Sequence, residues 1–135
     1  MPRLTALPFL LIAAPPVGAQ AVDAPIPVPS GQAVTFLDVV TDERGPSGLT
    51  YRFRFVAPGI GKDVGAVDFA MAAADLDHLC REYALPRLSS VGPQPSQIVI
   101  TLADRPIEFG VADPSVTQFF EAYRPENGDC IWEGF

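Results

Sequence analysis

The sequence has few of the residues on which metal and redox chemistry depend. It contains one histidine, His78, and two cysteines, Cys80 and Cys130. A single histidine excludes zinc and iron sites built from several histidines. The two cysteines lie too far apart in sequence to form a C-x-x-C redox motif. We therefore expect no metal site and no cofactor.

Basic residues are also scarce. The chain has 9 Lys and Arg residues against 16 Asp and Glu residues, which gives a formal net charge of -7. A protein this acidic repels nucleic acid and anionic lipid. Sequence patterns for catalysis are missing too. There is no G-x-S-x-G elbow, and the glycine-rich stretch 59–65 has Asp63 where a phosphate-binding loop needs Ser or Thr. No residue is predicted to be catalytic.

Long hydrophobic runs are absent after the N-terminus. The chain begins with Arg3, an apolar stretch over residues 4–17 and a small-residue exit at 19–21 that fits the A-x-A cleavage pattern. This run is broken by prolines and is shorter than the about 20 residues that a membrane-spanning helix needs. We predict a signal peptide over residues 1–21, cleaved after Ala19 or Ala21. The mature protein is then periplasmic, with no transmembrane segment.

Two cysteines in an exported chain allow one intramolecular pairing. Disulfides form and persist in oxidising compartments, so we predict a bond between Cys80 and Cys130. In the chain-entropy model, a crosslink over a loop of this length stabilises the fold by about 4 kcal/mol.

Proline and hydrophobic periodicity predict the organisation of the chain. Residues 22–32 alternate proline with apolar residues and predict an extended linker. Residues 33–135 are predicted to form a single domain. Its clearest strand covers residues 50–56, where three aromatic side chains alternate with Arg52 and Arg54. The aromatic face is expected to enter the core, and the arginine face is expected to be solvated.

One principal helix is predicted over residues 73–85 and is expected to end at Pro86. An apolar stripe from Ala72 to Tyr83 includes Cys80 and places it toward the core. The opposite, solvated face is expected to carry Asp75, His78 and Glu82.

The C-terminal part is predicted to add strands. Residues 97–102 have the composition of a buried strand, and residues 107–111 are expected to return as its hairpin partner. Residues 115–124 fit either a helix or a strand. A hairpin is favoured because Asn127-Gly128 is a strong turn signal and six residues follow the turn region. The predicted fold class is α+β, with one principal helix packed on a mainly antiparallel sheet and stapled by one disulfide.

Several blocks of the sequence resemble a family of small exported alphaproteobacterial proteins of unknown function. The resemblance is carried by the segments 30–34 (SGQAV), 48–58 (GLTYRFRFVAP), 77–80 (DHLC), 97–100 (QIVI) and 128–135 (GDCIWEGF). It covers nearly the whole mature chain. The resemblance implies no catalytic residue.

Two functions are compatible with these features. The first is a non-catalytic envelope protein that binds a protein partner, for example as an accessory subunit. The alternative is a small periplasmic hydrolase that uses acidic residues, for which Asp75, His78 and Glu82 form the one local cluster. The first is favoured because no activating pair of residues is evident.

The C-terminal aromatic segment is the predicted partner surface. If Cys130 faces the helix, strand alternation turns Ile131 and Phe135 to the opposite side. Phe119 and Phe120 are adjacent, so only one of them can enter the main core. We therefore predict that Phe120, Ile131 and Phe135 contribute to an apolar interface.

The predicted export can be tested by measuring the mass of the exported protein. The intact mass of the protein recovered from the periplasm should show loss of the first 19 or 21 residues, because the three-part N-terminus is the substrate pattern of signal peptidase. A stable membrane-bound form that retains residues 1–21 would contradict the prediction.

Overall fold

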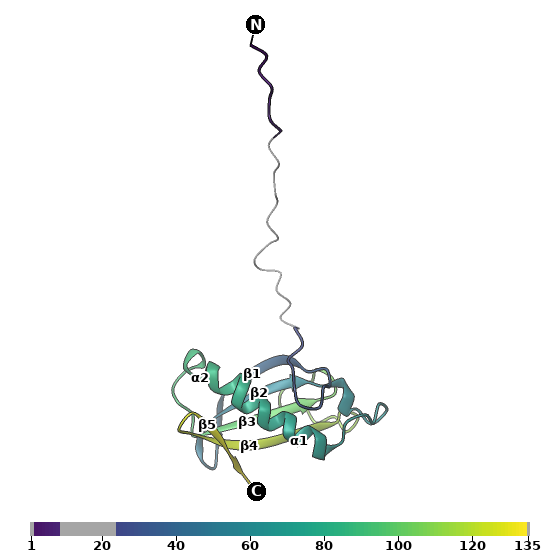
Figure 1. Cartoon of the computed structure of the whole chain (residues 1–135). Coiled ribbons are helices and arrows are strands. Elements are labelled where there is room, and N and C mark those ends of the chain that lie inside the picture. Colours follow the sequence, from purple (N-terminus) through teal and green to yellow (C-terminus); the bar gives the residue numbers. More distant parts are fainter. Residues whose placement is uncertain (1, 9–23, 135) are drawn as a thin grey trace.

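The computed structural model describes residues 2–8 and 24–134. It contains one five-stranded sheet with the strands in sequence order (Figure 1). The strands are β1 (Thr35–Gly45), β2 (Gly48–Val56), β3 (Gln97–Ala103), β4 (Gln118–Glu126) and β5 (Asp129–Glu133). Neighbouring strands are antiparallel except for β2 and β3, which are parallel. The predicted α+β class is confirmed. Most of the predicted signal peptide lies outside the described residues.

A helical segment connects the two parallel strands and lies across one face of the sheet (Figure 1). It consists of α1 (Phe69–His78), a π-helical turn (Leu79–Ala84) and α2 (Leu85–Val91), after a short 3-10 turn at Pro58–Ile60. The carboxylate of Asp68 caps its N-terminus by accepting a hydrogen bond from the Met71 backbone N–H at 2.9 Å. Parallel strands need a long crossover connection, and this segment provides it.

The prediction that the helix ends at Pro86 is wrong. The helical segment begins at Phe69 and continues through Pro86 to Val91. In a regular α-helix the proline ring would collide with the carbonyl of Glu82. The π turn changes the hydrogen-bond register just before this point, and the Leu85 N–H donates to the carbonyl of Cys80, five residues back. The helix therefore passes through the proline instead of stopping at it.

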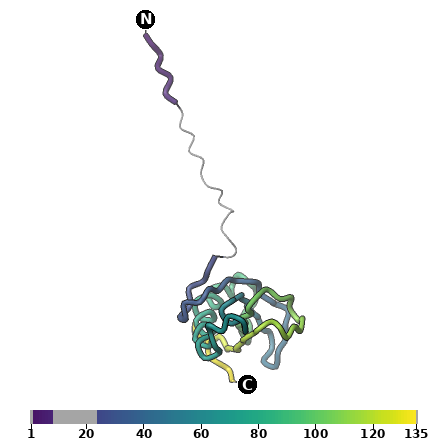
Figure 2. Tube along the Cα trace, turned by 90° about the vertical axis from the view of Figure 1, so that its right-hand side faces the viewer, coloured from purple at the N-terminus to yellow at the C-terminus, as the bar shows by residue number. Residues whose placement is uncertain are grey.

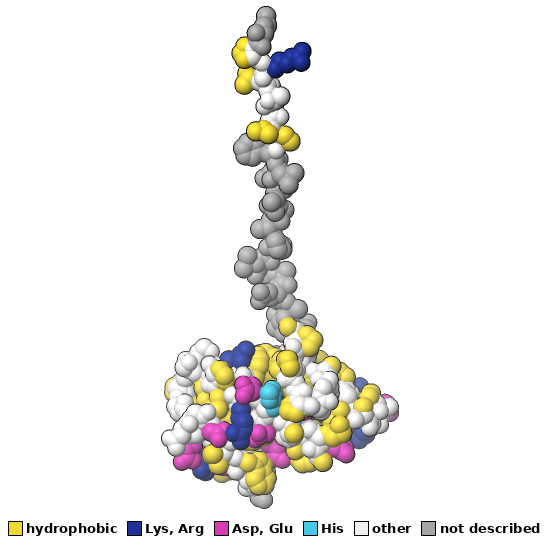
Figure 3. Space-filling view, in the orientation of Figure 1, with side chains coloured by type: hydrophobic (Ala, Val, Ile, Leu, Met, Phe, Trp, Pro, Cys, Tyr) yellow, Lys and Arg dark blue, Asp and Glu magenta, His cyan; other side chains and the backbone are white. Residues whose placement is uncertain are grey.

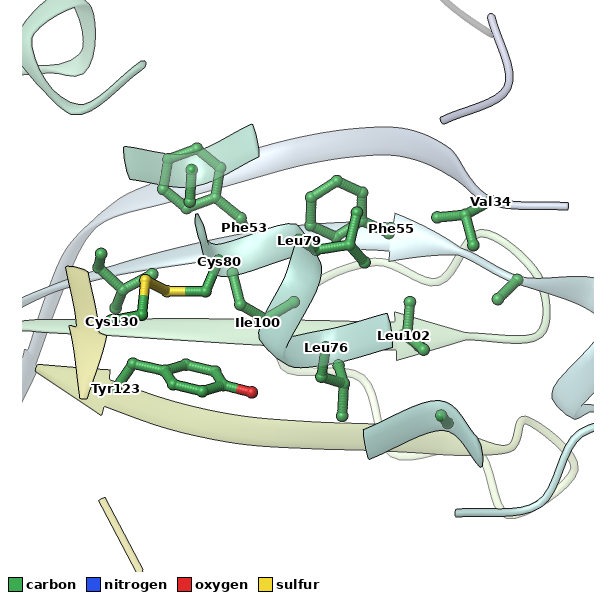
Figure 4. Close-up of a cluster of buried hydrophobic side chains, with 14 of the residues drawn as sticks. Val34, Phe53, Phe55, Leu76, Leu79, Cys80, Ile100, Leu102, Tyr123 and Cys130 are labelled. Carbon is green, nitrogen blue, oxygen red and sulfur yellow. A yellow bond between two sulfur atoms is a disulfide. The ribbon is translucent and has the colours of Figure 1, made fainter. Parts of the chain in front are cut away.

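The core lies between the helix and the aromatic face of β2. Tyr51, Phe53 and Phe55 are at most 2% exposed, as the alternation predicts. They belong to one core with Leu76 and Leu79 of the helical segment and with the inward side chains of β3, which are Ile98, Ile100 and Leu102. Figure 4 shows Phe53, Phe55, Leu76, Leu79, Ile100 and Leu102 of this core. The hydroxyl of Tyr51 donates a hydrogen bond to the Pro93 carbonyl at 2.6 Å.

The predicted disulfide is confirmed. Cys80 and Cys130 are bonded, with their Cα atoms 6.3 Å apart (Figure 4). The bond joins the π turn to the edge strand β5. Arg81 reinforces the same junction because its guanidinium group binds Asp77, Asp129 and the carbonyl of Cys130.

The C-terminal hairpin is also confirmed. Residues 118–126 and 129–133 are strands joined at Asn127 and Gly128, which have φ angles of 52° and 74°. Positive φ at both positions is typical of the tight hairpin turns that Asn-Gly favours.

The hairpin predicted between residues 97–102 and 107–111 is wrong. The antiparallel partner of β3 is β4, and residues 107–111 form no strand. Two hydrogen bonds hold the 104–117 segment in a path that does not pair with β3. Asp104 accepts a hydrogen bond from the Thr117 N–H at 2.8 Å, and Arg54 donates to the Ile107 carbonyl at 2.7 Å. The segment therefore loops over the sheet instead of extending it.

The described part of the proline-rich segment, residues 24–32, is bound to the domain and makes a turn at Pro29-Ser30. The Ile26 N–H donates to the Val34 carbonyl at 2.8 Å, and the side chains of Ile26 and Val28 pack against the core. Asp75 anchors the next residues. Its carboxylate accepts hydrogen bonds from the N–H and hydroxyl of Ser30, at 2.9 and 2.6 Å, and from the amide of Gln32 at 2.7 Å.

Removing the disulfide should cost about 4 kcal/mol of unfolding free energy, because the closed loop spans 50 residues. The double variant Cys80→Ala/Cys130→Ala should show this loss in urea unfolding and should be insensitive to reductant. A non-reducing digest of the native chain should contain one linked peptide pair. Equal stability of the native chain with and without reductant would contradict the prediction.

Asp75→Asn should destabilise the protein by about 1–3 kcal/mol, because an amide offers one acceptor oxygen to three donors and turns its own N–H groups toward them. Urea unfolding measures the loss.

Asp77→Asn is the matched control for Asp75→Asn. It lies on the same helix, but its side chain is 42% exposed and pairs with Arg81 at the surface, so it should cost less than about 1 kcal/mol. Equal losses of unfolding free energy in the two variants would show that the hydrogen bonds from Ser30 and Gln32 to Asp75 add no stability of their own.

Candidate functional site

The sheet has one face covered by the helix and one face that the helix leaves open. We call the second the open face. It carries the outward side chains of the strands and is crossed by the 104–117 segment. Figure 2 shows the helical layer and this segment on opposite sides of the molecule. Side chains on the open face follow from strand register and include Asp38, Glu43, Arg52, Arg54, Thr101, Phe120, Arg124 and Ile131.

Arg54 is buried on this face, so the predicted solvated arginine face is wrong at this position. It is 8% exposed. Its guanidinium group donates two hydrogen bonds to Asp38, both at 2.6 Å, and one to the Ile107 carbonyl. A buried charge is stable only when it is paired and hydrogen-bonded. Asp38 and the 104–117 segment supply these partners and remove Arg54 from solvent.

Arg52 lies beside it and is partly buried. It donates to both carboxylate oxygens of Glu43, at 3.1 and 3.2 Å, and to the Thr101 hydroxyl at 3.1 Å. The guanidinium carbons of Arg52 and Arg54 lie 5.7 and 5.8 Å from the centre of the Phe109 ring. Cation–π attraction at these distances holds the ring over the sheet.

A groove of about 430 Å³ runs between the sheet and the 104–117 segment. A smaller hollow of about 150 Å³ adjoins it toward the β1–β2 turn and shares Glu43, Arg52 and Phe120 with it. Three large apolar side chains line the groove while remaining about half exposed. They are Phe109 (48%), Val111 (48%) and Phe120 (50%).

The residues of the predicted partner surface can now be placed. Phe120 pairs with Thr101 and lies on the open face, whereas its neighbour Phe119 packs on the helix side. Ile131 is 37% exposed and pairs with Arg124, so it also lies on the open face. Phe135 lies outside the described residues. Binding by these side chains stays a prediction.

Phe109 and Val111 were missed at the sequence level. They fall in residues 107–111, which were expected to form the hairpin partner of residues 97–102. The sequence signal that could have found them is the Asp104-Arg105-Pro106 start of the segment together with Gly110, because proline and glycine interrupt strands.

A second hollow lies on the helix side. It measures about 510 Å³ and is bounded by residues 24–27, by Phe36 and by the helix. His78 and Glu82 line it, and Arg87 stacks on the Tyr83 ring at 3.6 Å from its centre. Figure 3 shows the histidine, in cyan, at this surface among acidic and basic side chains.

Asp75 does not join His78 and Glu82, so the predicted solvated cluster of three is wrong. Asp75 is fully buried and bound to Ser30 and Gln32. Residues 30–32 bind this carboxylate on the helix surface that the sequence pattern assigned to solvent. The hydrolase hypothesis is left with two of its three residues at the surface.

Two side chains that line neither hollow, Asp113 and Tyr123, have shifted pKa values. The pKa of Asp113 is lowered by hydrogen bonds from the hydroxyl and backbone of Ser115, which keeps this exposed carboxyl ionised. Burial raises the pKa of the Tyr123 phenol well above its usual value, so it stays protonated. Within residues 2–8 and 24–134, no three His, Cys, Asp or Glu side chains gather as metal ligands would.

The described part of the chain contains no helix of the length and apolarity required to cross a membrane.

Comparison with known proteins places the chain in a family but not in a functional class. No curated protein and no solved structure is significantly similar to it. A model of one protein family matches residues 10–135, which is nearly the entire chain. The protein therefore belongs to DUF6497, a family of unknown function.

Proposed function

We propose that this chain is an exported, non-catalytic envelope protein that binds a protein partner through the open face of its sheet. The observation that carries the proposal is the groove, around which Phe109, Val111 and Phe120 are each about half exposed. Large apolar side chains gathered on one surface are typical of interaction sites. The N-terminal signal-like pattern supports export, and an oxidising compartment suits the disulfide.

Two features support a binding role over hydrolysis. The hydrolase hypothesis needs a cluster of acids with His78, and Asp75 is committed to holding residues 30–32. The aromatic ring of Phe109 is held in place by two arginines that are themselves fixed by Asp38 and Glu43. A rigid, partly exposed ring favours binding, because little conformational entropy is lost when a partner covers it.

Photocrosslinking from the groove tests the proposal. A benzoylphenylalanine placed at position 109 or 120 should give a discrete crosslinked species in cells, because both side chains would contact the partner. Phe120→Ser and Ile131→Ser should weaken this capture while lowering the unfolding free energy by only about 1 kcal/mol each, since both side chains are partly exposed. Gel mobility and peptide mass spectrometry identify the species.

Trp132 provides the matched control. It pairs with Tyr123, so it lies on the helix side, and it is 62% exposed. Benzoylphenylalanine at position 132 should not give the same species, and Trp132→Ser should leave capture unchanged. Absence of a discrete crosslink from both groove positions would reject the proposal. A large loss of stability in Phe120→Ser would show instead that Phe120 belongs to the core.

A further inference from the structure

The open-face groove is poorly suited to an anionic ligand, although two arginines line it. All three guanidinium nitrogens of Arg52 and all three of Arg54 donate to acceptors within the protein. An incoming phosphate or carboxylate would have to displace Asp38 at 2.6 Å or Glu43 at 3.1 Å. The positive charges of Arg52 and Arg54 are therefore already paired with acceptors within the protein.

The remaining charge of the open face is negative. Its strand arginines each form a salt bridge with one acid: Arg52 with Glu43, Arg54 with Asp38 and Arg124 with Glu126. The 104–117 segment also carries Arg105 and Asp113, whose opposite charges attract each other. Further acids on this side include Glu108, which lines the groove, and Glu133 on β5, which accepts a hydrogen bond from Gln97 at 3.5 Å. Neither takes part in a salt bridge within residues 24–134. The surplus of acid attracts a cationic partner.

A second copy of this chain is disfavoured as the occupant. Each copy has a formal net charge of -7, and two copies placed open face to open face would bring their surplus negative charges together. Like charges facing each other across an interface oppose association. The groove therefore favours a different protein that carries positive charge.

The sheet edges are less suitable than the face for an extended partner. The pairing of β1 is interrupted by two register shifts, between Phe36 and Asp38 and between Val40 and Glu43. The opposite edge strand, β5, has five residues. Bulged or short edges resist the addition of another strand. A partner would therefore use side-chain contacts on the face rather than backbone pairing at an edge.

We infer that the groove binds a basic segment of a protein partner in which Lys or Arg residues alternate with apolar ones. The inference rests on the proposed function and specifies its partner. The apolar side chains of the segment pack on Phe109, Val111 and Phe120, and its cationic groups pair with Glu108 and Glu133. Lys and Arg stems also cover apolar surface while their charged ends stay in water.

Synthetic peptides provide the test. The probe is an acetylated, amidated peptide of repeated Lys-Val-Lys-Ser, and the comparison peptides are repeats of Glu-Val-Glu-Ser and Lys-Ser-Lys-Ser. NMR titration of the purified protein should show shifts concentrated in residues 107–111 and 118–120 for the first peptide. The glutamate peptide should not bind, and loss of valine should weaken binding at least about fivefold, since a buried methyl-bearing side chain contributes about 1 kcal/mol or more.

Charge variants measure the electrostatic contribution to peptide binding. Glu108→Gln should weaken binding of the lysine–valine peptide about twofold to fivefold, as expected for one exposed ion pair. Glu82→Gln is the matched control: it removes the same charge from the helix side and should leave the affinity unchanged. Raising salt from about 50 mM to about 300 mM should weaken binding severalfold, because the Debye length shortens.

The outcomes separate this inference from the proposed function. Equal binding of the lysine and glutamate peptides, shifts spread over the whole protein, or equal effects of Glu108→Gln and Glu82→Gln would each overturn the basic occupant. If one of these results is obtained but crosslinks from positions 109 and 120 appear, the proposed partner binding stands and only the basic character of the partner is rejected. If the crosslinks are absent as well, both conclusions fail.

Discussion

The parallel pairing of β2 and β3 is the constraint from which the rest of the molecule follows. Antiparallel neighbours can be joined by tight turns, but a parallel pair requires the chain to cross back over the sheet. The crossover here is the helical segment from Phe69 to Val91. It covers the face formed by Tyr51, Phe53 and Phe55, and its Cys80 reaches β5. The same crossover leaves the arginine side of β2 to be covered by a loop.

Because a helix covers one face of the sheet and a loop covers the other, the two faces are stabilised by different interactions. The helix side is sealed by apolar packing and one covalent bond. The open face is organised by ion pairs, because Arg52 and Arg54 alternate with the core aromatics and must lie opposite them. Their carboxylate partners fix the arginines, the arginines fix Phe109, and Phe109 borders the groove. The candidate site is thus a consequence of how the sheet accommodates charge next to its core.

Local sequence signals predicted the parts of the structure that depend on local chemistry. Strict alternation gave the orientation of β2, the Asn127-Gly128 turn gave the last hairpin, and the export pattern suggested the Cys80–Cys130 bond. Asp75 could not be placed in this way, because its burial depends on residues 30–32, more than 40 positions away. The course of residues 107–111 likewise depends on Arg54, 53 positions earlier. Strand register places Phe120 and Ile131 on the open face, and alternation within a strand is a local pattern. Phe109 was missed because its position is set by tertiary contacts.

The π turn is related to the spacing of buried residues along the helical segment. Five of the buried positions in the helical segment are spaced four residues apart, at Ala72, Leu76, Cys80, Ala84 and Leu88. In a regular α-helix, each step of four residues advances about 40° around the axis, so the first and last of these would lie about 160° apart. All five are nevertheless buried, and the wider turn at Leu79–Ala84 absorbs part of that rotation. A four-residue repeat of small and apolar side chains, sustained over this length, is therefore a sequence signature of a helix that must unwind locally to stay on one sheet.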